Sequence, residues 1–206
     1  MRDLLILGAG VHAGEMVEIV ERINSVTHTW ILRGMVSSTE NQTRQTELNQ
    51  CPVMTPAEAF KRFPKAALVP DNSWPRTSDI QPKRLITLID PSAWVSRTAT
   101  IGRGGVIYPG CYVGLNARIG DYLFCLSNTI INHDDTLGRN VCLASGVILA
   151  GNVTVEDDCY LGQGCMVRQS LRIGANSMVG MGAVVVKDVP PRAVMAGNPA
   201  RKIKDT

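Results

Sequence analysis

A six-residue period runs through the second half of the chain and constrains its fold more than any other feature. From residue 95 onward, every sixth position holds the same kind of side chain, and fifteen of the sixteen are aliphatic. These positions are Val95, Ile101, Ile107, Val113, Ile119, Cys125, Ile131, Leu137, Leu143, Leu149, Val155, Leu161, Val167, Ile173, Val179 and Val185. Such a period predicts a solenoid of short stacked repeats.

Two further positions of each repeat keep the same phase. The residue after the aliphatic one is often glycine, and the residue four places after it is mostly small. The glycines are Gly102, Gly114, Gly120, Gly138, Gly162, Gly174 and Gly180, and the small residues include Ala99, Gly105, Cys111, Ala117, Thr129, Cys159, Cys165, Ser177 and Ala183. Each unit thus supplies a short strand and a corner, and three units make a coil of 18 residues. We predict a parallel β-helix of about five coils, roughly 25 Å tall.

The composition agrees with a narrow interior and excludes several classes of protein. Aromatic residues make up only 5% of the 206 residues, beside 19 glycines. A net charge of +3 without a Lys/Arg block argues against a nucleic-acid partner. No run approaches the roughly 18 apolar residues of a membrane helix, and the first residues lack a signal-peptide cleavage site. We therefore expect a cytoplasmic protein with no membrane partner.

Most of the six cysteines fit the repeat better than they fit metal or redox chemistry. No CxxC pair occurs. Cys111, Cys159 and Cys165 fall in the small position and Cys125 in the aliphatic one, where a thiol behaves as a compact apolar group. We expect reduced, structural cysteines and no metal site.

The first ninety residues follow a different pattern, in which strands and helices alternate. We predict strands at 3–7, 29–36, 66–69 and 84–89, a helix from the glycine turn to about residue 24, and a helix at 56–63 with Thr55 as its N-cap. Residues 71–83 are predicted to be a loop. The expected organisation is a small α/β Rossmann-like domain, residues 1–90, followed by a β-helix domain with its C-terminal tail, residues 91–206.

The turn after the first strand carries a phosphate-binding pattern. Gly8, Gly10 and Ala13 fit G-x-G-x-x-G/A, in which glycines let backbone N–H groups approach a phosphate at a helix start. The acidic residue expected after the second strand is missing, because Ser37 and Ser38 stand there. A dehydrogenase is disfavoured, since about 75 residues of sheet are too few for both dinucleotide halves. A nucleotide site and a tight turn without a ligand both remain open.

His133 is the histidine that the repeat positions for chemistry. It follows the inward Ile131 by two residues, so its imidazole should project from the solenoid. Asp134 follows directly, and a carboxylate beside the ring fixes its tautomer and raises its basicity. From these residues alone, a solvated surface pair is the alternative to a catalytic one.

Four segments together resemble a known family: the GAGVHA turn, INHDDTLG, LAGNV and AGNPARKIK. With a hexapeptide solenoid after a small α/β unit, the chain is similar, over nearly its whole length, to the sialic-acid O-acetyltransferase and bacterial nucleotide-amino-sugar N-acetyltransferase family. The resemblance implies a left-handed β-helix, a hand that the period itself does not fix. It also implies a homotrimer that transfers an acetyl group from acetyl-CoA to a sugar, expected to be a nucleotide-linked amino sugar.

The resemblance also assigns roles to the solenoid residues. His133 is the expected general base toward the acceptor amine or hydroxyl, and Asp134 orients it. The 18-residue coil stacks Gly151 directly above His133, where its backbone N–H is expected to bind the thioester oxygen as it becomes an oxyanion. The expected acetyl-CoA contacts, in a groove between two solenoids, are Gly151, Cys142, Gln163 and Met181.

The N-terminal unit is expected, by the same resemblance, to hold the sugar nucleotide. The expected contacts are Gly8, Gly10, Val11, His12, Ser37 and Ser38. For His12, a plain helix-start residue remains the alternative. The basic tail of Arg201, Lys202 and Lys204 either meets CoA phosphates or is a solvated terminus.

Three positions depart from the family pattern. Members often carry an Asp pair where Ser37-Ser38 stands, Asn where Leu126 stands, and a second histidine where Cys142 stands. The sugar, the nucleotide and the choice between N- and O-acetylation therefore stay open at this point.

Two other classes of hexapeptide solenoid protein do not fit this sequence. A zinc carbonic anhydrase needs three histidine ligands, and the solenoid contains one. A nucleotide-sugar pyrophosphorylase needs a larger catalytic domain than ninety residues. Two alternatives remain: acetylation of another small acceptor, such as a sialic acid or a free sugar hydroxyl, and a non-catalytic, nucleotide-binding trimeric scaffold.

Overall fold

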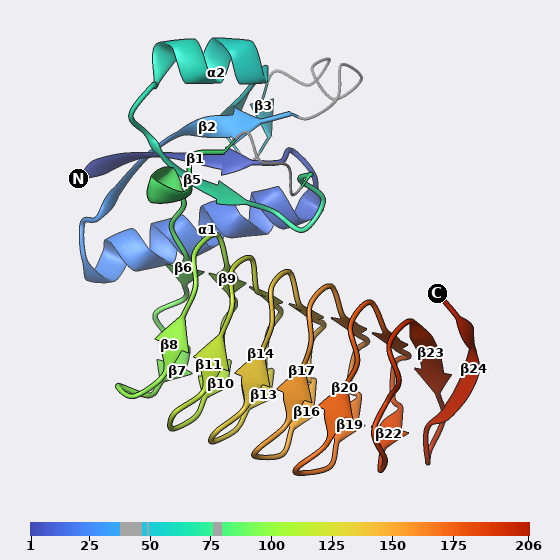
Figure 1. Cartoon of the computed structure of the whole chain (residues 1–206). Coiled ribbons are helices and arrows are strands. Elements are labelled where there is room, and N and C mark those ends of the chain that lie inside the picture. Colours follow the sequence, from blue (N-terminus) through green and yellow to red (C-terminus); the bar gives the residue numbers. More distant parts are fainter. Residues whose placement is uncertain (38–46, 49, 76–79) are drawn as a thin grey trace. The chain divides into compact units, whose positions relative to one another are not determined.

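The computed structural model describes residues 1–37, 47–48, 50–75 and 80–206 (Figure 1). The chain divides into two compact units, Met1–Pro91 with Arg103–Gly105, and Ser92–Gly102 with Val106–Thr206. Each unit is described by itself. Within the described residues, neither helix has the length and apolar character needed to cross a membrane.

The first unit is built on a five-stranded sheet of order β3-β4-β2-β1-β5. The strands are β1 (Arg2–Leu7), β2 (Trp30–Val36), β3 (Glu47–Leu48), β4 (Cys51–Met54) and β5 (Ala67–Pro70). All neighbours are parallel except β3 and β4. The remaining elements are α1 (Val11–Val26), α2 (Pro56–Arg62), the 3-10 turn η2 (Pro82–Arg84) and β6 (Leu88–Ile89). The parallel pairing brings the carboxyl ends of β1, β2 and β5 to one edge.

Local sequence explains where these elements begin. Thr55 precedes α2, and its Oγ1 accepts a hydrogen bond from the Glu58 N–H at 3.2 Å, which confirms the predicted N-cap. The predicted strand at 84–89 is confirmed only in part, because Leu88–Ile89 forms a strand while Leu85 makes an isolated parallel bridge to Leu68. Pro82 begins a 3-10 turn there, and the Arg84 guanidinium donates to the Ala66 carbonyl at 2.9 Å. The β3–β4 hairpin was not predicted.

The second unit is a parallel β-solenoid of two-residue strands (Figure 1). They are β7 (Trp94–Val95), β8 (Thr100–Ile101), β9 (Val106–Ile107), β10 (Tyr112–Val113), β11 (Arg118–Ile119), β12 (Phe124–Cys125), β13 (Ile130–Ile131), β14 (Thr136–Leu137), β15 (Cys142–Leu143), β16 (Ile148–Leu149), β17 (Thr154–Val155), β18 (Tyr160–Leu161), β19 (Met166–Val167), β20 (Arg172–Ile173), β21 (Met178–Val179) and β22 (Val184–Val185). The second residue of each strand is the predicted inward position, which confirms the six-residue period.

The strands stack into three sheets whose register repeats every 18 residues. One sheet runs β7-β10-β13-β16-β19-β22, another runs β8-β11-β14-β17-β20, and the third contains β9-β12-β15-β18-β21-β23-β24. Val113 pairs with Ile131, and Ile131 pairs with Leu149. The last coil is shorter, since Val179 pairs with Met195 in β23 (Ala193–Ala196). The predicted coil length is therefore confirmed up to this last turn.

The corners between strands require residues in the left-handed region. Five of them are asparagines with φ between 56° and 61°, namely Asn116, Asn128, Asn140, Asn152 and Asn176. Asparagine and aspartate reach this region at lower cost than most residues. Asp134, with φ 61°, belongs to the same set of corners.

The basic tail continues the solenoid rather than forming a loose end. Arg201, Lys202 and Lys204 lie in β24 (Arg201–Asp205), which pairs antiparallel with β23. Lys202 also forms an ion pair with Asp205 at 2.7 Å. The side chains of β24 are all exposed to solvent, as expected for a solvated terminus, and the contact with CoA phosphates stays a prediction.

Removing an inward aliphatic side chain should destabilise the solenoid. Leu143 has no exposed surface, so Leu143→Ala should lower the free energy of unfolding by about 2–5 kcal/mol through lost burial and a residual cavity. Thr100→Ala, at an exposed first position of β8, should change it by less than about 0.5 kcal/mol. Denaturant unfolding at one fixed protein concentration measures both, and equal effects would contradict the assigned inward face.

Candidate active site

His133 lies at a corner of the solenoid, two residues after the fully buried Ile131 of β13. Its side chain is 57% exposed, and its Nδ1 lies 2.9 Å from Asp134 Oδ2. The other carboxylate oxygen of Asp134 accepts a hydrogen bond from Asn116 Nδ2 at 3.1 Å, from the coil before. The two residues therefore form the pair that the sequence predicted, held by a third residue.

The charge state of Asp134 decides which ring nitrogen carries the proton. Hydrogen bonds from His133 and then from Asn116 hold the pKa of Asp134 below its ordinary value, so the carboxylate is ionised at neutral pH. An ionised carboxylate only accepts hydrogen bonds, so Nδ1 of the neutral ring is the donor. Nε2 is then left with a free lone pair and can take up a proton.

Gly151 lies against the imidazole, one coil further along. The Asn152 N–H donates to the His133 carbonyl at 3.0 Å, which joins the two turns. A Cβ atom on Gly151 would lie 2.5 Å from His133 Nε2, so the ring occupies the space that any side chain would fill. Among the hydrogen bonds of the described residues the Gly151 N–H donates none, although its carbonyl accepts one from the Ser170 N–H. Base and backbone donor thus lie together at one corner.

A buried carboxylate beneath this corner was not predicted. Asp135 is fully buried, and it accepts hydrogen bonds from the Asn132 N–H at 2.7 Å and the Val153 N–H at 2.8 Å. Burial raises the pKa of Asp135 to about 6. The signal was present in the sequence, because Asp135 occupies the position four residues after Ile131 that is elsewhere small or apolar.

The other expected acetyl-CoA contacts do not gather around His133 within one chain. Cys142 is the first residue of β15, in another sheet, and is largely buried. Gln163 and Met181 follow β18 and β21, at the corner that leads into the sheet of β13 rather than out of it. Met181 is 75% exposed and stands one coil beyond Gln163.

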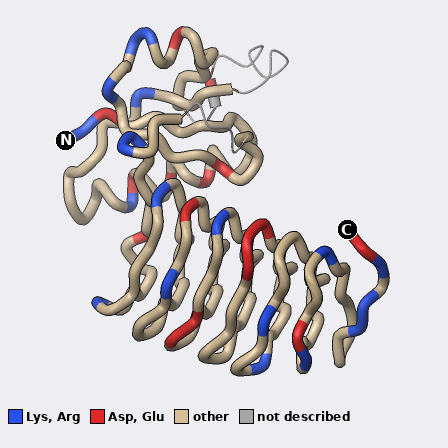
Figure 2. The backbone as a smooth tube through the Cα atoms, in the orientation of Figure 1, with Lys and Arg blue, Asp and Glu red and all other residues tan. Residues whose placement is uncertain are grey.

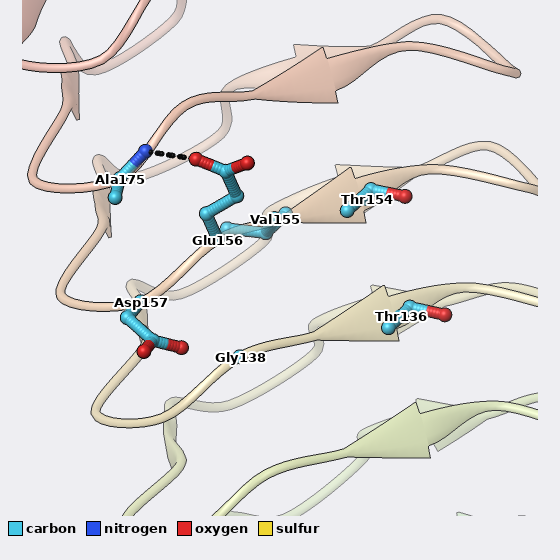
Figure 3. Close-up of a pocket in the computed structure, with 7 residues that line it drawn as sticks. All are labelled: Thr136, Gly138, Thr154, Val155, Glu156, Asp157 and Ala175. Carbon is cyan, nitrogen blue, oxygen red and sulfur yellow. Dashed lines mark hydrogen bonds between the residues drawn. The ribbon is translucent and has the colours of Figure 1, made fainter.

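Two pockets flank the corners of the solenoid. One, of about 450 Å³, is lined by Ala150, Arg168, Gln169 and Ser170, directly beside Gly151. The other, of about 370 Å³, opens on the sheet of β14 and β17 and is lined by Thr136, Gly138, Thr154, Val155, Glu156, Asp157 and Ala175 (Figure 3). There Glu156 already accepts from the Ala175 N–H at 2.7 Å, and Asp157 accepts from the Arg139 N–H at 2.7 Å. The first pocket borders Gly151, because Ala150 directly precedes it and the Ser170 N–H donates to its carbonyl.

In the first unit, the candidate nucleotide residues lie at the carboxyl edge of the sheet. The Gly8 N–H donates to the Val36 carbonyl at 2.8 Å, and the buried Ser37 follows β2. Gly8 has φ 134°, and a side chain there would overlap the buried carboxylate of Asp71, which follows β5. This close approach gives Gly8 a structural reason to be glycine. Sequence analysis did not single out Asp71.

The start of α1 is more open. Gly10 precedes the helix with open space around its Cα, and the described side chains provide no cap to the helix N-terminus. Val11 is 79% exposed, and His12 pairs with Glu15 at 3.0 Å. Ser38 lies outside the described residues. Within the described residues, no group of three or more His, Cys, Asp or Glu side chains could hold a metal ion.

Comparison with known proteins identifies the relatives of this chain. No protein-family model matches the chain. The GDP-perosamine N-acetyltransferase of Escherichia coli O157:H7 is 33% identical over 159 residues, which cover 72% of this chain and 71% of that protein. Several acyl-[acyl-carrier-protein]–UDP-N-acetylglucosamine O-acyltransferases also match, but the chain spans only 30–42% of the length of these curated relatives.

Solved structures of similar fold match almost the whole chain. The acetyltransferase domain of PglB from Neisseria gonorrhoeae has a TM-score of 0.83 at 25% identity, covering 98% of this chain and 100% of that one. PerB from Caulobacter crescentus, solved with CoA and GDP-perosamine, has a TM-score of 0.83 at 24% identity, covering 98% and 97%. By its likeness to the Escherichia coli enzyme over more than two thirds of both chains, the protein belongs to the hexapeptide-repeat sugar O-/N-acetyltransferase family.

Proposed function

We propose that the protein is an acetyl-CoA-dependent N-acetyltransferase that acts on a nucleotide-linked amino sugar. The observation that carries the proposal is the His133 imidazole, paired with the ionised Asp134 and packed on the backbone of Gly151. The Escherichia coli relative is named as an N-acetyltransferase of a nucleotide-linked amino sugar, which favours an amine acceptor over a hydroxyl. PerB with CoA and PglB with acetyl-CoA support acetyl-CoA as the donor.

In the proposed reaction, His133 Nε2 removes a proton from the acceptor amine as the nitrogen attacks the thioester carbonyl carbon. Asp134 holds the ring in the required tautomer and stabilises the imidazolium that forms. The Gly151 N–H donates to the carbonyl oxygen while that oxygen carries negative charge. The carbon–sulfur bond then breaks, and the proton held on His133 passes to the leaving thiolate.

For the nucleotide, we propose the carboxyl edge of the first sheet. Gly10, Val11 and His12 stand at the start of α1, where the N-terminal end of the helix dipole suits a phosphate. Gly8 and Ser37 border it, and Ser38 is proposed to belong to the same site. The parallel order β4-β2-β1-β5, with a glycine turn after β1, supports a Rossmann-like unit. Which nucleotide binds depends on the serines that stand in place of the family's acidic pair.

For the solenoid, we propose the left hand of its family and a homotrimer. In the sheet from β7 to β22 and in the sheet from β9 to β21, the first residue of every strand is apolar or aromatic. Within these strands, all of which the structure describes, no residue is charged (Figure 2). The sheet of β8, β11, β14, β17 and β20 instead presents threonines and arginines. Trp94 (51%) and Met166 (47%) are exposed on the first of these sheets. Two different apolar faces favour a head-to-tail contact that closes into a ring.

The trimer also accounts for the separated donor contacts. Cys142, Gln163 and Met181 are proposed to contact acetyl-CoA in a groove that a second solenoid completes. The reaction is proposed to occur in the cytoplasm, because the six cysteines are buried thiols rather than disulfides, as in a reducing compartment.

The activity is tested by incubating the protein with acetyl-CoA and a panel of UDP-, GDP- and TDP-linked 4-amino sugars and sialic acids, with product mass as the readout. An acetylated amino sugar is expected. His133→Ala and Gly151→Ala should each lower kcat by about a hundredfold or more, the first through loss of the base and the second because a Cβ displaces the ring.

Arg139→Ala is the matched control, since it changes the same turn position at a different corner. It should retain wild-type activity. A product that forms equally well with His133→Ala would overturn the mechanism. Acetylation confined to sialic acids would overturn the amine acceptor, and no acetylation at all would favour the non-catalytic scaffold.

The oligomer is tested by placing a charge on an apolar face. Met166→Glu should convert a trimer into monomers, because a buried carboxylate at the contact would lack a partner. Thr100→Glu, on the polar sheet, should leave the trimer intact. Size-exclusion chromatography with light scattering measures the mass of each. A monomeric wild-type protein, or a trimer unaffected by Met166→Glu, would contradict the proposed interface.

A further inference from the structure

The coil that carries His133 differs from the others in one inward position. Sixteen positions lie four residues after an inward residue of the repeat, and Asp135 is the one acidic residue among them. Ala117 occupies the same position one coil before, and Val153 one coil after. An apolar side chain thus satisfies this position elsewhere in the solenoid, and the carboxylate is not required to build a coil.

Asp135 also changes the hydrogen bonding of its own turn, which begins at Asn132. On this sheet, the residue after the strand normally donates its N–H to the strand of the next coil: Gly114 donates to the Ile131 carbonyl at 2.8 Å, and Ala150 donates to Val167 at 3.0 Å. The Asn132 N–H instead turns to Asp135 Oδ2 at 2.7 Å. The side-chain amide of Asn132 replaces the lost bond, donating to the Leu149 carbonyl at 3.1 Å.

The second oxygen of Asp135 reaches the turn that carries Gly151. Oδ1 accepts from the Val153 N–H at 2.8 Å, two residues after Gly151. Asn132, on the other oxygen, directly precedes His133. One carboxylate therefore binds the backbone on the His133 turn and on the Gly151 turn at once.

We propose that Asp135 is a positioning residue that clamps these two turns together and so holds His133 Nε2 at its working distance from the Gly151 N–H. The inference rests on the proposed acetyl transfer. Asp135 touches neither substrate nor the reacting atoms, and it acts through the backbone of both turns. Both oxygens must accept hydrogen bonds for the clamp to close, and with a pKa of about 6 the group is mostly ionised at neutral pH.

The burial of a charge argues against a role in stability alone. An ionised group out of water carries a desolvation cost, and replacing it with an apolar side chain of suitable size is often neutral or stabilising. Valine fills the same inward position at Val141, Val147 and Val153. Asp135→Val should therefore give an ordinary coil that folds well, but without the clamp.

The test compares Asp135→Val and Asp135→Asn with the wild type, using Ser177→Ala as the matched control. Ser177 is a buried polar residue in the same inward position of a later coil, where it accepts from the Ala193 N–H and donates to the Pro190 carbonyl. We would measure kcat and KM for acetyl-CoA, Tm, and the NMR resonances of the His133 ring, assigned by their loss in His133→Ala.

Asp135→Val is expected to keep the wild-type Tm or exceed it, to change KM less than about threefold, and to lower kcat about ten- to a hundredfold, as small misplacements of reacting groups do. Its His133 resonances should shift. Asp135→Asn, in which one oxygen becomes a donor, should also lose kcat. Ser177→Ala should retain the wild-type kcat and His133 resonances, whatever its Tm.

Wild-type kcat with unshifted His133 resonances in Asp135→Val would overturn the clamp. So would a loss of activity that merely follows a loss of folded protein. If the wild type acetylates none of the panel, the proposed function fails separately. The His133 resonances then still decide the clamp, because they report on the ring without any reaction.

Discussion

The 18-residue register of the stacked strands is the constraint on which the rest of the solenoid depends. Each strand donates to the strand one coil on, so residues 18 apart in sequence lie one above the other. Two residues that are 18 positions apart in the sequence are therefore separated in space by one strand spacing. The His133 imidazole and the backbone of Gly151 therefore meet without any long-range packing between separate elements.

The chemistry of the corner comes from backbone requirements as much as from side chains. Asp134 occupies a left-handed position that asparagine fills at neighbouring corners, and the same residue type supplies the carboxylate for the ring. Gly151 leaves space that the imidazole fills, so the ring and the N–H approach more closely than any side chain would permit. One turn geometry thus serves both the fold and the proposed proton transfer.

Periodicity carried the sequence prediction of the solenoid, since a repeat fixes register, inward face and the pairing of His133 with Gly151. The repeat marks Asp135 as an exception to the rule of small or apolar inward residues, but it does not show which backbone N–H groups the carboxylate binds. In the first unit, the propensities of single residues did not predict the β3–β4 hairpin. They also predicted a strand that begins too early, because Pro82 starts a 3-10 turn and Arg84 bonds to the Ala66 carbonyl. Cys142, Gln163 and Met181 lie apart within one chain. The spacing of residues along one chain does not predict which of them line the proposed groove between two copies.

The end of the solenoid has a consequence for how copies can associate. A parallel stack leaves N–H and C=O groups open at its last coil, which is a template for end-to-end growth into fibres. Here β24 folds back antiparallel on β23, and its exposed strand carries Arg201, Lys202, Lys204 and Asp205. A reversed strand does not match the parallel ladder of another solenoid, and charged side chains on an edge oppose pairing with a second copy. The C-terminal hairpin thereby opposes end-to-end pairing with another copy at this edge of the sheet.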